Sequence, residues 1–97
     1  MNIEFHPRVF SEIDAIMGYY EDVAGFTLAN DFYPEFRSAV LEASEHPQLV
    51  SERLGSYRRV NLRRFPYNFL FRELDDRIGI LVVRHHARHP DFGARRK

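Results

Sequence analysis

The hydrophobic pattern of this chain changes its period once, near Gly55. Before Gly55, apolar side chains recur every three or four residues, which is the spacing of one face of an α-helix. After Gly55 they alternate with polar side chains, as in a strand that is covered on one face. Helices followed by a run of strands predict the α+β class, with the order β-α-α-β-β-β once a short strand at Ile3–Phe5 is included.

Two helices are predicted, and a few residues join them as in a helical hairpin. The first begins at Pro7, whose missing N–H costs nothing in the first turn, and it ends at Gly25. Thr27 can cap the second helix, and His46-Pro47 ends it. Pro34 removes one backbone hydrogen bond from the second helix, so we expect either a kink just before that residue or a start later than Thr27.

Each helix carries one apolar face that is predicted to pack on the sheet. In the first helix this face consists of Val9, Ile13, Ile16, Tyr20 and Val23, widened by Phe10, Met17 and Ala24. In the second helix it consists of Leu28, Phe32, Phe36, Val40 and Ala43. The acidic residues of the first helix lack the isolation that an acid–base pair needs, so a solvated face is predicted for Glu12, Glu21 and Asp22.

Three strands are predicted after the polar connection 48–55, namely Ser56–Phe65, Tyr67–Leu74 and Ile78–Val83. Pro66 and the pair Asp75-Asp76 mark the turns between them, which makes an antiparallel meander. The third run is apolar on both faces and is therefore predicted to be central and covered. The strand at residues 3–5 can add to an edge of this sheet, and the helical hairpin covers the sheet. No linker divides the chain, so residues 1–97 are expected to form a single domain.

Composition excludes several kinds of site. The chain has no cysteine, which excludes disulfides and thiolate metal sites. His85, His86 and His89 lie close together, but no carboxylate or further histidine stands at a recognised metal-ligand spacing, so neither a metal nor a cofactor is predicted. The chain shows no signal peptide, and no apolar stretch approaches ~18 residues, so we expect a cytoplasmic protein without a membrane partner.

The two halves of the chain carry opposite charge. Residues 1–52 hold ten Asp and Glu and two Arg, a net charge of −8, and residues 53–97 hold twelve Lys and Arg and four Asp and Glu, a net charge of +8. The basic half could meet an anionic partner, or the two halves could fold together and neutralise each other. The charge pattern alone leaves both interpretations open.

Four arginines stand within seven positions of the first predicted strand: Arg58, Arg59, Arg63 and Arg64. On a strand, Arg59 and Arg63 share one face and Arg58 and Arg64 the other. Guanidinium groups bind phosphate or carboxylate groups through paired hydrogen bonds. This face could bind RNA by charge and by stacking, or it could be a solvated strand face beside the acidic helices. The aromatic side chains that flank it are Tyr57, Tyr67 and Phe69.

A second cationic stretch, Val82 to Arg96, begins within the last predicted strand. Side chains at the end of a rigid strand are well placed for a functional site. Histidine can transfer protons near neutral pH, and arginine can stabilise a negatively charged transition state. A basic tail with exposed histidines is the alternative interpretation. The residues concerned are Arg84, His85, His86, Arg88 and His89.

Four stretches of the chain resemble the RelE/ParE superfamily, the toxins of bacterial type II toxin–antitoxin systems. They are YYEDVAGFTLANDFYPEF near the helical turn, HP after it, RRVNLRRFPYNFLFREL, and ILVVRHHARHPDFGARR. The resemblance spans nearly the whole chain in order. Its most specific pieces are RRFPY before an apolar strand and the pattern H..R.P.....R after the last strand. It implies the same β-αα-βββ layout and a cognate antitoxin that wraps the toxin.

The resemblance implies two alternative activities. RelE-like members are endoribonucleases that cut mRNA on the ribosome, whereas ParE-like members inhibit DNA gyrase through protein–protein contact. RelE-like catalysis relies on a basic residue and a tyrosine where this chain has Asn68 and Phe92, and neither an amide nor a phenyl ring can replace them. The ParE-like branch is therefore favoured, with gyrase contacted by Arg84, Arg88, Phe92, Arg95 and Arg96. The alternative is a nuclease that uses Arg64, His85, His86 and Arg88.

The resemblance also implies a role for the arginine-rich strand. An acidic, amphipathic antitoxin segment is expected to lie across it, with apolar anchors supplying affinity and charges orienting the encounter. Operator DNA is expected as a partner only through the antitoxin, and the implied role is growth inhibition that stabilises plasmids. A non-toxic member of the family is a third alternative. The expected antitoxin contacts are Arg59, Arg63, Tyr57, Tyr67 and Phe69.

Overall fold

The computed structural model of this protein describes residues 2–50 and 57–97. The order of its elements confirms the predicted α+β class: β1 (Asn2–Phe5), α1 (Arg8–Ala24), α2 (Phe26–Glu45), the short 3₁₀ helix η1 (Pro47–Leu49), β2 (Tyr57–Asn61), β3 (Tyr67–Glu73) and β4 (Arg77–His85). Ser56, the predicted start of the first long strand, and positions 51–55 of the connection lie outside the described residues. Within the described part of the chain, no helix has the length and apolar character needed to cross a membrane.

The four strands form one sheet in the order β1-β4-β3-β2. β2, β3 and β4 pair antiparallel with their sequence neighbours, as predicted. β1 adds to the edge of the sheet beside β4, but it runs parallel to β4, from Asn2 opposite Arg77 to Phe5 opposite Ile80. The sheet is therefore mixed rather than purely antiparallel. Parallel pairing needs a long connection, and here the helical hairpin and two strands separate β1 from β4 in the chain.

Both faces of β4 are covered, as its unbroken apolar run predicted. Its register with β3 shifts between Leu70, which lies opposite Val82, and Phe71, which lies opposite Ile80. Leu81 is the extra residue of a β-bulge, and a bulge of this kind reverses the alternation of side chains along the strand. β4 consequently contributes Ile78, Ile80 and Val83 to the helix side of the sheet and Leu81 and Val82 to the opposite side.

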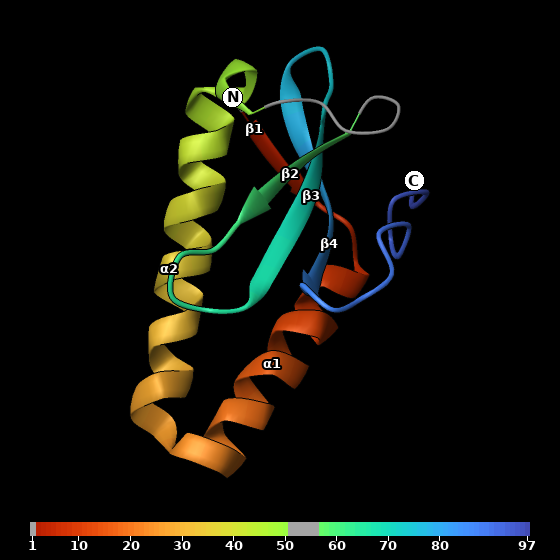
Figure 1. Ribbon diagram of the computed structural model, residues 1–97. Coiled ribbons are helices and arrows are strands. Elements are labelled where there is room, and N and C mark those ends of the chain that lie inside the picture. Colours follow the sequence, from red (N-terminus) through yellow and green to blue (C-terminus); the bar gives the residue numbers. More distant parts are fainter. Residues whose placement is uncertain (1, 51–56) are drawn as a thin grey trace.

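The main hydrophobic core lies between the helical hairpin and one face of the sheet (Figure 1). The predicted helical faces supply its centre with Val9, Ile13, Ile16, Phe32, Phe36, Val40 and Ala43. The widened face of the first helix was predicted too broadly, because Phe10 and Val23 are 57% and 60% exposed. The last turn of α1 projects beyond the ends of the strands (Figure 1), so residues at that end of the helix have no sheet to cover them.

α2 begins earlier than predicted and continues through its proline. Gly25 separates the two helices with a φ of 85°, a conformation that glycine adopts at little cost. The helix begins at Phe26, and Thr27 makes no capping hydrogen bond, so both the predicted cap and the predicted later start are wrong. Pro34 lies inside the helix and is exposed, and it leaves one backbone hydrogen bond of the helix unmade.

β2 ends at Asn61, four residues before the predicted end of that strand. The chain turns there, and the N–H groups of Arg63 and Arg64 donate to one carboxylate oxygen of Glu35 on α2, at 2.8 and 3.1 Å. The prediction that the four arginines alternate between the two faces of a strand therefore applies only to Arg58 and Arg59, which lie in β2. It is wrong for Arg63 and Arg64, which follow the strand. A carboxylate that binds two backbone N–H groups from another element leaves no periodic trace in the sequence.

Candidate functional site

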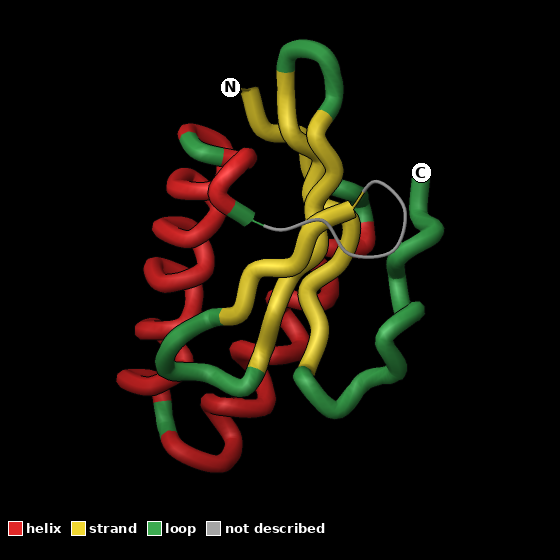
Figure 2. The backbone as a smooth tube through the Cα atoms, turned by 45° about the horizontal axis from the view of Figure 1, so that its top comes forward, coloured by secondary structure: helices red, strands yellow, loops and turns green. Residues whose placement is uncertain are grey.

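The C-terminal segment, residues 86–97, folds back along the side of the sheet away from α2 (Figure 2). It consists of tight turns that are closed by hydrogen bonds such as Phe92 N–H to His89 O and Arg96 N–H to Gly93 O. Its apolar residues join a second, smaller cluster on the sheet face opposite the helices: Tyr57, Leu70, Leu81, Val82, Phe92 and Ala94. The segment is thus a folded cover of the sheet rather than a free basic tail.

Arg84, near the end of β4, holds this segment from beneath. Its side chain is buried, and its Nη1 donates to the carbonyl oxygens of His89, Pro90 and Phe92 at 3.3, 2.6 and 2.8 Å. Burial lowers the pKa of Arg84, and the positive charge of Arg59 adds to this effect, although an arginine stays protonated in proteins. The guanidinium therefore ties three main-chain carbonyls of the segment to the end of β4.

The five residues predicted to contact a target divide into two groups. Arg88 and Arg95 are exposed. Arg84 is only 5% exposed, and the side chain of Arg96 is 12% exposed. Phe92 is half-buried, and the guanidinium carbon of Arg88 lies 4.3 Å from the centre of its ring. Arg84 and Arg96 bind groups within the protein and expose little of their side chains, so their contact with a target stays a prediction.

A polar network joins the C-terminal segment to β2 and β3. An arginine only donates, so Asn68 turns its Oδ1 toward Nε of Arg84 (3.0 Å), and its NH₂ group donates to Nδ1 of His86 (3.0 Å). Nδ1 of His86 is therefore the unprotonated nitrogen of a neutral ring. Nη2 of Arg59 lies 3.4 Å from the same nitrogen. The pKa of His86 is lowered, first by burial and then by the charges of Arg59 and His85.

We expect His86 to titrate below the ordinary histidine pKa of 6.5. Because the folded state favours the neutral ring, the unfolded state binds more protons just below pH 6.5. The stability that this site contributes is therefore complete above pH 6.5 and is lost as the pH falls from there toward the folded-state pKa. An NMR titration of the imidazole signals checks this, with His86→Gln identifying the signal. A pKa of 6.5 or higher would contradict the network.

The four residues of the nuclease alternative do not converge on one pocket. Arg64 pairs with Asp31 of α2 at 3.3 Å and lines the pocket beneath α2 described below. His85 and Arg88 line a separate hollow of about 320 Å³ beside α1, here called the α1 hollow. His86 belongs to the polar network. Within residues 2–50 and 57–97, no three His, Asp or Glu side chains are placed to hold a metal ion.

The two positions where RelE-like catalysis would need a basic residue and a tyrosine have structural partners instead. Asn68 is 1% exposed and links Arg84 to His86. Phe92 packs on the smaller apolar cluster. Neither side chain presents a proton donor or a positive charge to solvent.

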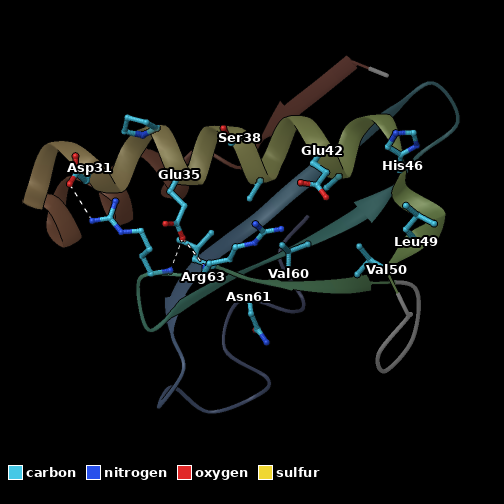
Figure 3. A pocket seen from close by; sticks show the side chains of 15 residues that line it. Asp31, Glu35, Ser38, Glu42, His46, Leu49, Val50, Val60, Asn61 and Arg63 are labelled. Carbon is cyan, nitrogen blue, oxygen red and sulfur yellow. Dashed lines mark hydrogen bonds and ion pairs between the residues drawn. The ribbon is translucent and has the colours of Figure 1, made fainter.

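A pocket of about 670 Å³ lies between α2, η1 and β2 (Figure 3) and is here called the pocket beneath α2. Its apolar lining comes mainly from Ala39, Ala43, Leu49, Val50, Val60 and Leu62. In Figure 3, Glu35 and Glu42 extend from α2 toward the strand side, where Arg63 lies, and Asn61 points away from the pocket. Charges of both signs around an apolar floor are typical of a site for an amphipathic peptide.

The five residues predicted to contact an antitoxin do not share one surface. Arg63 lines the pocket beneath α2, whereas Tyr57 and Arg59 face the C-terminal segment. Tyr67 is half-buried against the main core. Phe69 is 0% exposed, so its prediction as a surface contact is wrong. The period of β3 directs Phe69, like Tyr67, toward the helices, where Phe36 stacks against it edge-on.

Two residues that hold the C-terminal segment in place were not predicted from the sequence. Gly93 has a φ of 79°, and a Cβ added there would lie 2.5 Å from Cβ of Val82. Glu12, predicted on a solvated face, instead accepts the N–H of Val83 at 3.1 Å and pairs with Arg96 at 2.8 Å. For Gly93, the sequence offered one indication, a glycine among turn residues. For Glu12 it offered none, because both partners of Glu12 come from the far end of the chain.

Comparisons with known proteins identify the family of the chain and a solved structure with the same fold. Residues 3–90 match the family described as the ParE toxin of the type II toxin–antitoxin system parDE. Among solved structures, a chain of the chromosomal ParDE TA system from P. aeruginosa shares the fold, with a TM-score of 0.78 and 19% sequence identity over 88% of this chain and 95% of that chain. No curated protein matches significantly. The family match covers nearly every helix and strand, and the chain therefore belongs to the ParE toxin family of type II toxin–antitoxin systems.

Proposed function

We propose that this protein inhibits growth by binding DNA gyrase through its C-terminal segment and that a cognate antitoxin neutralises it. Membership of the ParE toxin family supports the toxin role. The observation that carries the proposal is the presentation of Arg88 and Arg95, two exposed cations on a segment that buried contacts hold against the sheet. The proposed partners are cytoplasmic, so we expect the protein to act in the bacterial cytoplasm.

The surroundings of these two arginines suit contact with an acidic protein surface. Arg88 borders the α1 hollow together with His85, Tyr19 and Tyr67. Arg95 borders a shallow hollow of about 450 Å³ on the other side of Phe92, here called the Arg95 hollow, which also includes Arg8. Acidic side chains of a target would pair with the arginines, and the half-buried ring of Phe92 between them would supply apolar contact.

A gyrase supercoiling assay tests the proposal. The purified protein should block supercoiling, and Arg88→Met and Arg95→Met should each raise the half-inhibitory concentration about tenfold or more, since a charge-assisted contact is worth roughly 1.5–3 kcal/mol. Arg37→Met, which removes an exposed arginine on α2, is the matched control and should leave inhibition unchanged. Full inhibition by the Arg88→Met/Arg95→Met protein would show that another surface binds gyrase.

The same preparation separates the two branches of the superfamily. It should leave ribosome-bound mRNA intact in an in vitro translation reaction, as judged by mapping the message ends. Cuts in the message together with unimpaired gyrase would assign the RelE-like activity instead. Normal growth on induction without an antitoxin would identify a non-toxic member of the family.

We infer that the antitoxin segment crosses the β2 edge of the sheet. Arg59 lies on one side of this edge and Arg63, beneath α2, on the other, so one extended chain crossing the edge can meet both. β2 is an outer strand of the sheet, so no further strand of the described residues stands between the two sides of this edge. The pocket beneath α2 offers an apolar floor for the segment's anchors. Adding the antitoxin to the supercoiling assay should restore gyrase activity.

A further inference from the structure

β4 extends past the strand that covers its outer edge. β1 pairs with β4 only as far as Phe5 opposite Ile80, and the N–H of His6 makes a last hydrogen bond to Ile80 O at 2.9 Å. β4 itself continues to His85. Among the residues that the structure describes, no strand lies beside residues 81–85 on this edge, and backbone groups in such a position need other partners.

Two charged side chains take the place of the missing strand. Oε1 of Glu12, from α1, accepts the N–H of Val83 at 3.1 Å, and Nη1 of Arg96 donates to the carbonyl of Leu81 at 3.2 Å. The same Nη1 lies 2.8 Å from Oε2 of Glu12, and the two side chains are only 17% and 12% exposed. Each charge thus depends on the other, because a buried charge without its partner is costly.

The pair also links the C-terminal segment to the rest of the molecule. The guanidinium carbon of Arg96 lies 5.3 Å from the centre of the Phe92 ring, and Nη2 of Arg72 donates to Arg96 O at 2.6 Å. Glu12 lines the α1 hollow and Arg96 lines the Arg95 hollow. The two hollows that carry the exposed arginines are therefore shaped by the two members of one ion pair.

We propose that Glu12 and Arg96 form a latch that holds the C-terminal segment closed on the β4 edge and so positions Arg88 and Arg95. The two are called positioning residues because their charged groups bind each other and the backbone of β4. The consequence for gyrase inhibition rests on the function proposed above, whereas the latch itself is a property of the isolated protein. It is therefore tested by a measurement that needs no target.

The test compares Glu12→Gln, Arg96→Met and the double variant with the wild-type protein. Glutamine retains an oxygen that can accept the Val83 N–H but replaces the oxygen facing Arg96 by an NH₂ donor, so this change isolates the ion pair. Glu21→Gln, an exposed carboxylate of the same helix, and Arg37→Met, an exposed arginine of α2, are the matched controls. Amide hydrogen exchange is followed residue by residue, together with tryptic cleavage after Arg88 and Arg95.

Each latch variant is expected to exchange the amides of residues 92–96 about tenfold faster or more, which is the signature of local opening. The core amides of Phe69 and Phe71 should keep their wild-type rates, which separates opening of the segment from a general loss of stability. The double variant should be no worse than either single variant, because the pair opens as a unit. Both controls should match the wild type.

Unchanged exchange in residues 92–96 and unchanged tryptic cleavage in Glu12→Gln would overturn the latch. Faster exchange throughout the core would overturn it as well, since Glu12 would then support the whole fold. The supercoiling assay on the same proteins keeps the two proposals apart. A wild-type protein that fails to inhibit gyrase would refute the function but not the latch, and wild-type inhibition by an opened Glu12→Gln protein would refute the positioning role.

Discussion

Replacing Gly93 with alanine is expected to detach the C-terminal segment from the sheet. The new Cβ would lie 2.5 Å from Cβ of Val82, and the φ of 79° is strained for any residue with a side chain. Left-handed strain and overpacking each cost about 1–3 kcal/mol, so we expect the free energy of unfolding to fall by roughly 3 kcal/mol. Urea denaturation measures this loss, and faster amide exchange in residues 92–96 shows where it arises.

Gly18→Ala is the matched control, because it makes the same chemical change where there is room for it. Gly18 lies within α1, and a Cβ added there meets no atom within 4 Å. Alanine is favoured over glycine in a helix, so this variant should be more stable by about 0.5–1 kcal/mol. The two alanine substitutions thus have opposite expected signs. A Gly93→Ala protein as stable as the wild type would show that the segment does not pack on Val82.

Phe69→Ala is expected to lower the free energy of unfolding by about 3–5 kcal/mol, the range for removing a buried phenylalanine ring. Phe69 has no exposed surface, and it packs edge-on against Phe36 with ring centres 5.6 Å apart. Strands flank β3 on both sides, so its backbone has little room to move into the space that the ring leaves. Urea denaturation again gives the value.

Phe26→Ala makes the same truncation at a side chain that is 71% exposed, and its effect should stay within about 0.5 kcal/mol. The comparison also tests the correction made for Phe69, which the sequence pattern assigned to a binding surface. If Phe69→Ala lowered stability no more than Phe26→Ala, the residue would not belong to the core, and a surface role for it would return.

Most of the architecture could be predicted from the sequence because both helices and all three long strands are amphipathic or fully apolar. Val9, Ile13 and Ile16 repeat with the period of a helix face, and that face is buried. The unbroken apolar run of β4 correctly indicated a strand covered on both sides. The predictions were wrong at the ends of helices, as with the cap at Thr27 and the buried position of Val23. At a helix end, the hydrophobic period does not show whether another element lies against the side chain.

The candidate site could be predicted only as a region. Cationic residues after the last strand marked the C-terminal segment, but Arg84 and Arg96 carry the same charge as Arg88 and Arg95 and differ from them only in burial. An arginine that binds main-chain carbonyls is indistinguishable in a sequence from one that faces solvent. The same holds for Phe69, whose aromatic character fits a core and a binding surface equally well.

Within a regular helix or strand, the side chains that share a face follow from the local period of 3.6 or 2 residues. The element that covers each face follows from contacts between distant parts of the chain. The bulge at Leu81 is invisible in a run of four apolar residues, and the parallel pairing of β1, the turn held by Glu35 and the pair Glu12–Arg96 all join parts far apart in the chain. Such contacts depend on distances in the folded molecule, and local periodicity contains no information about them.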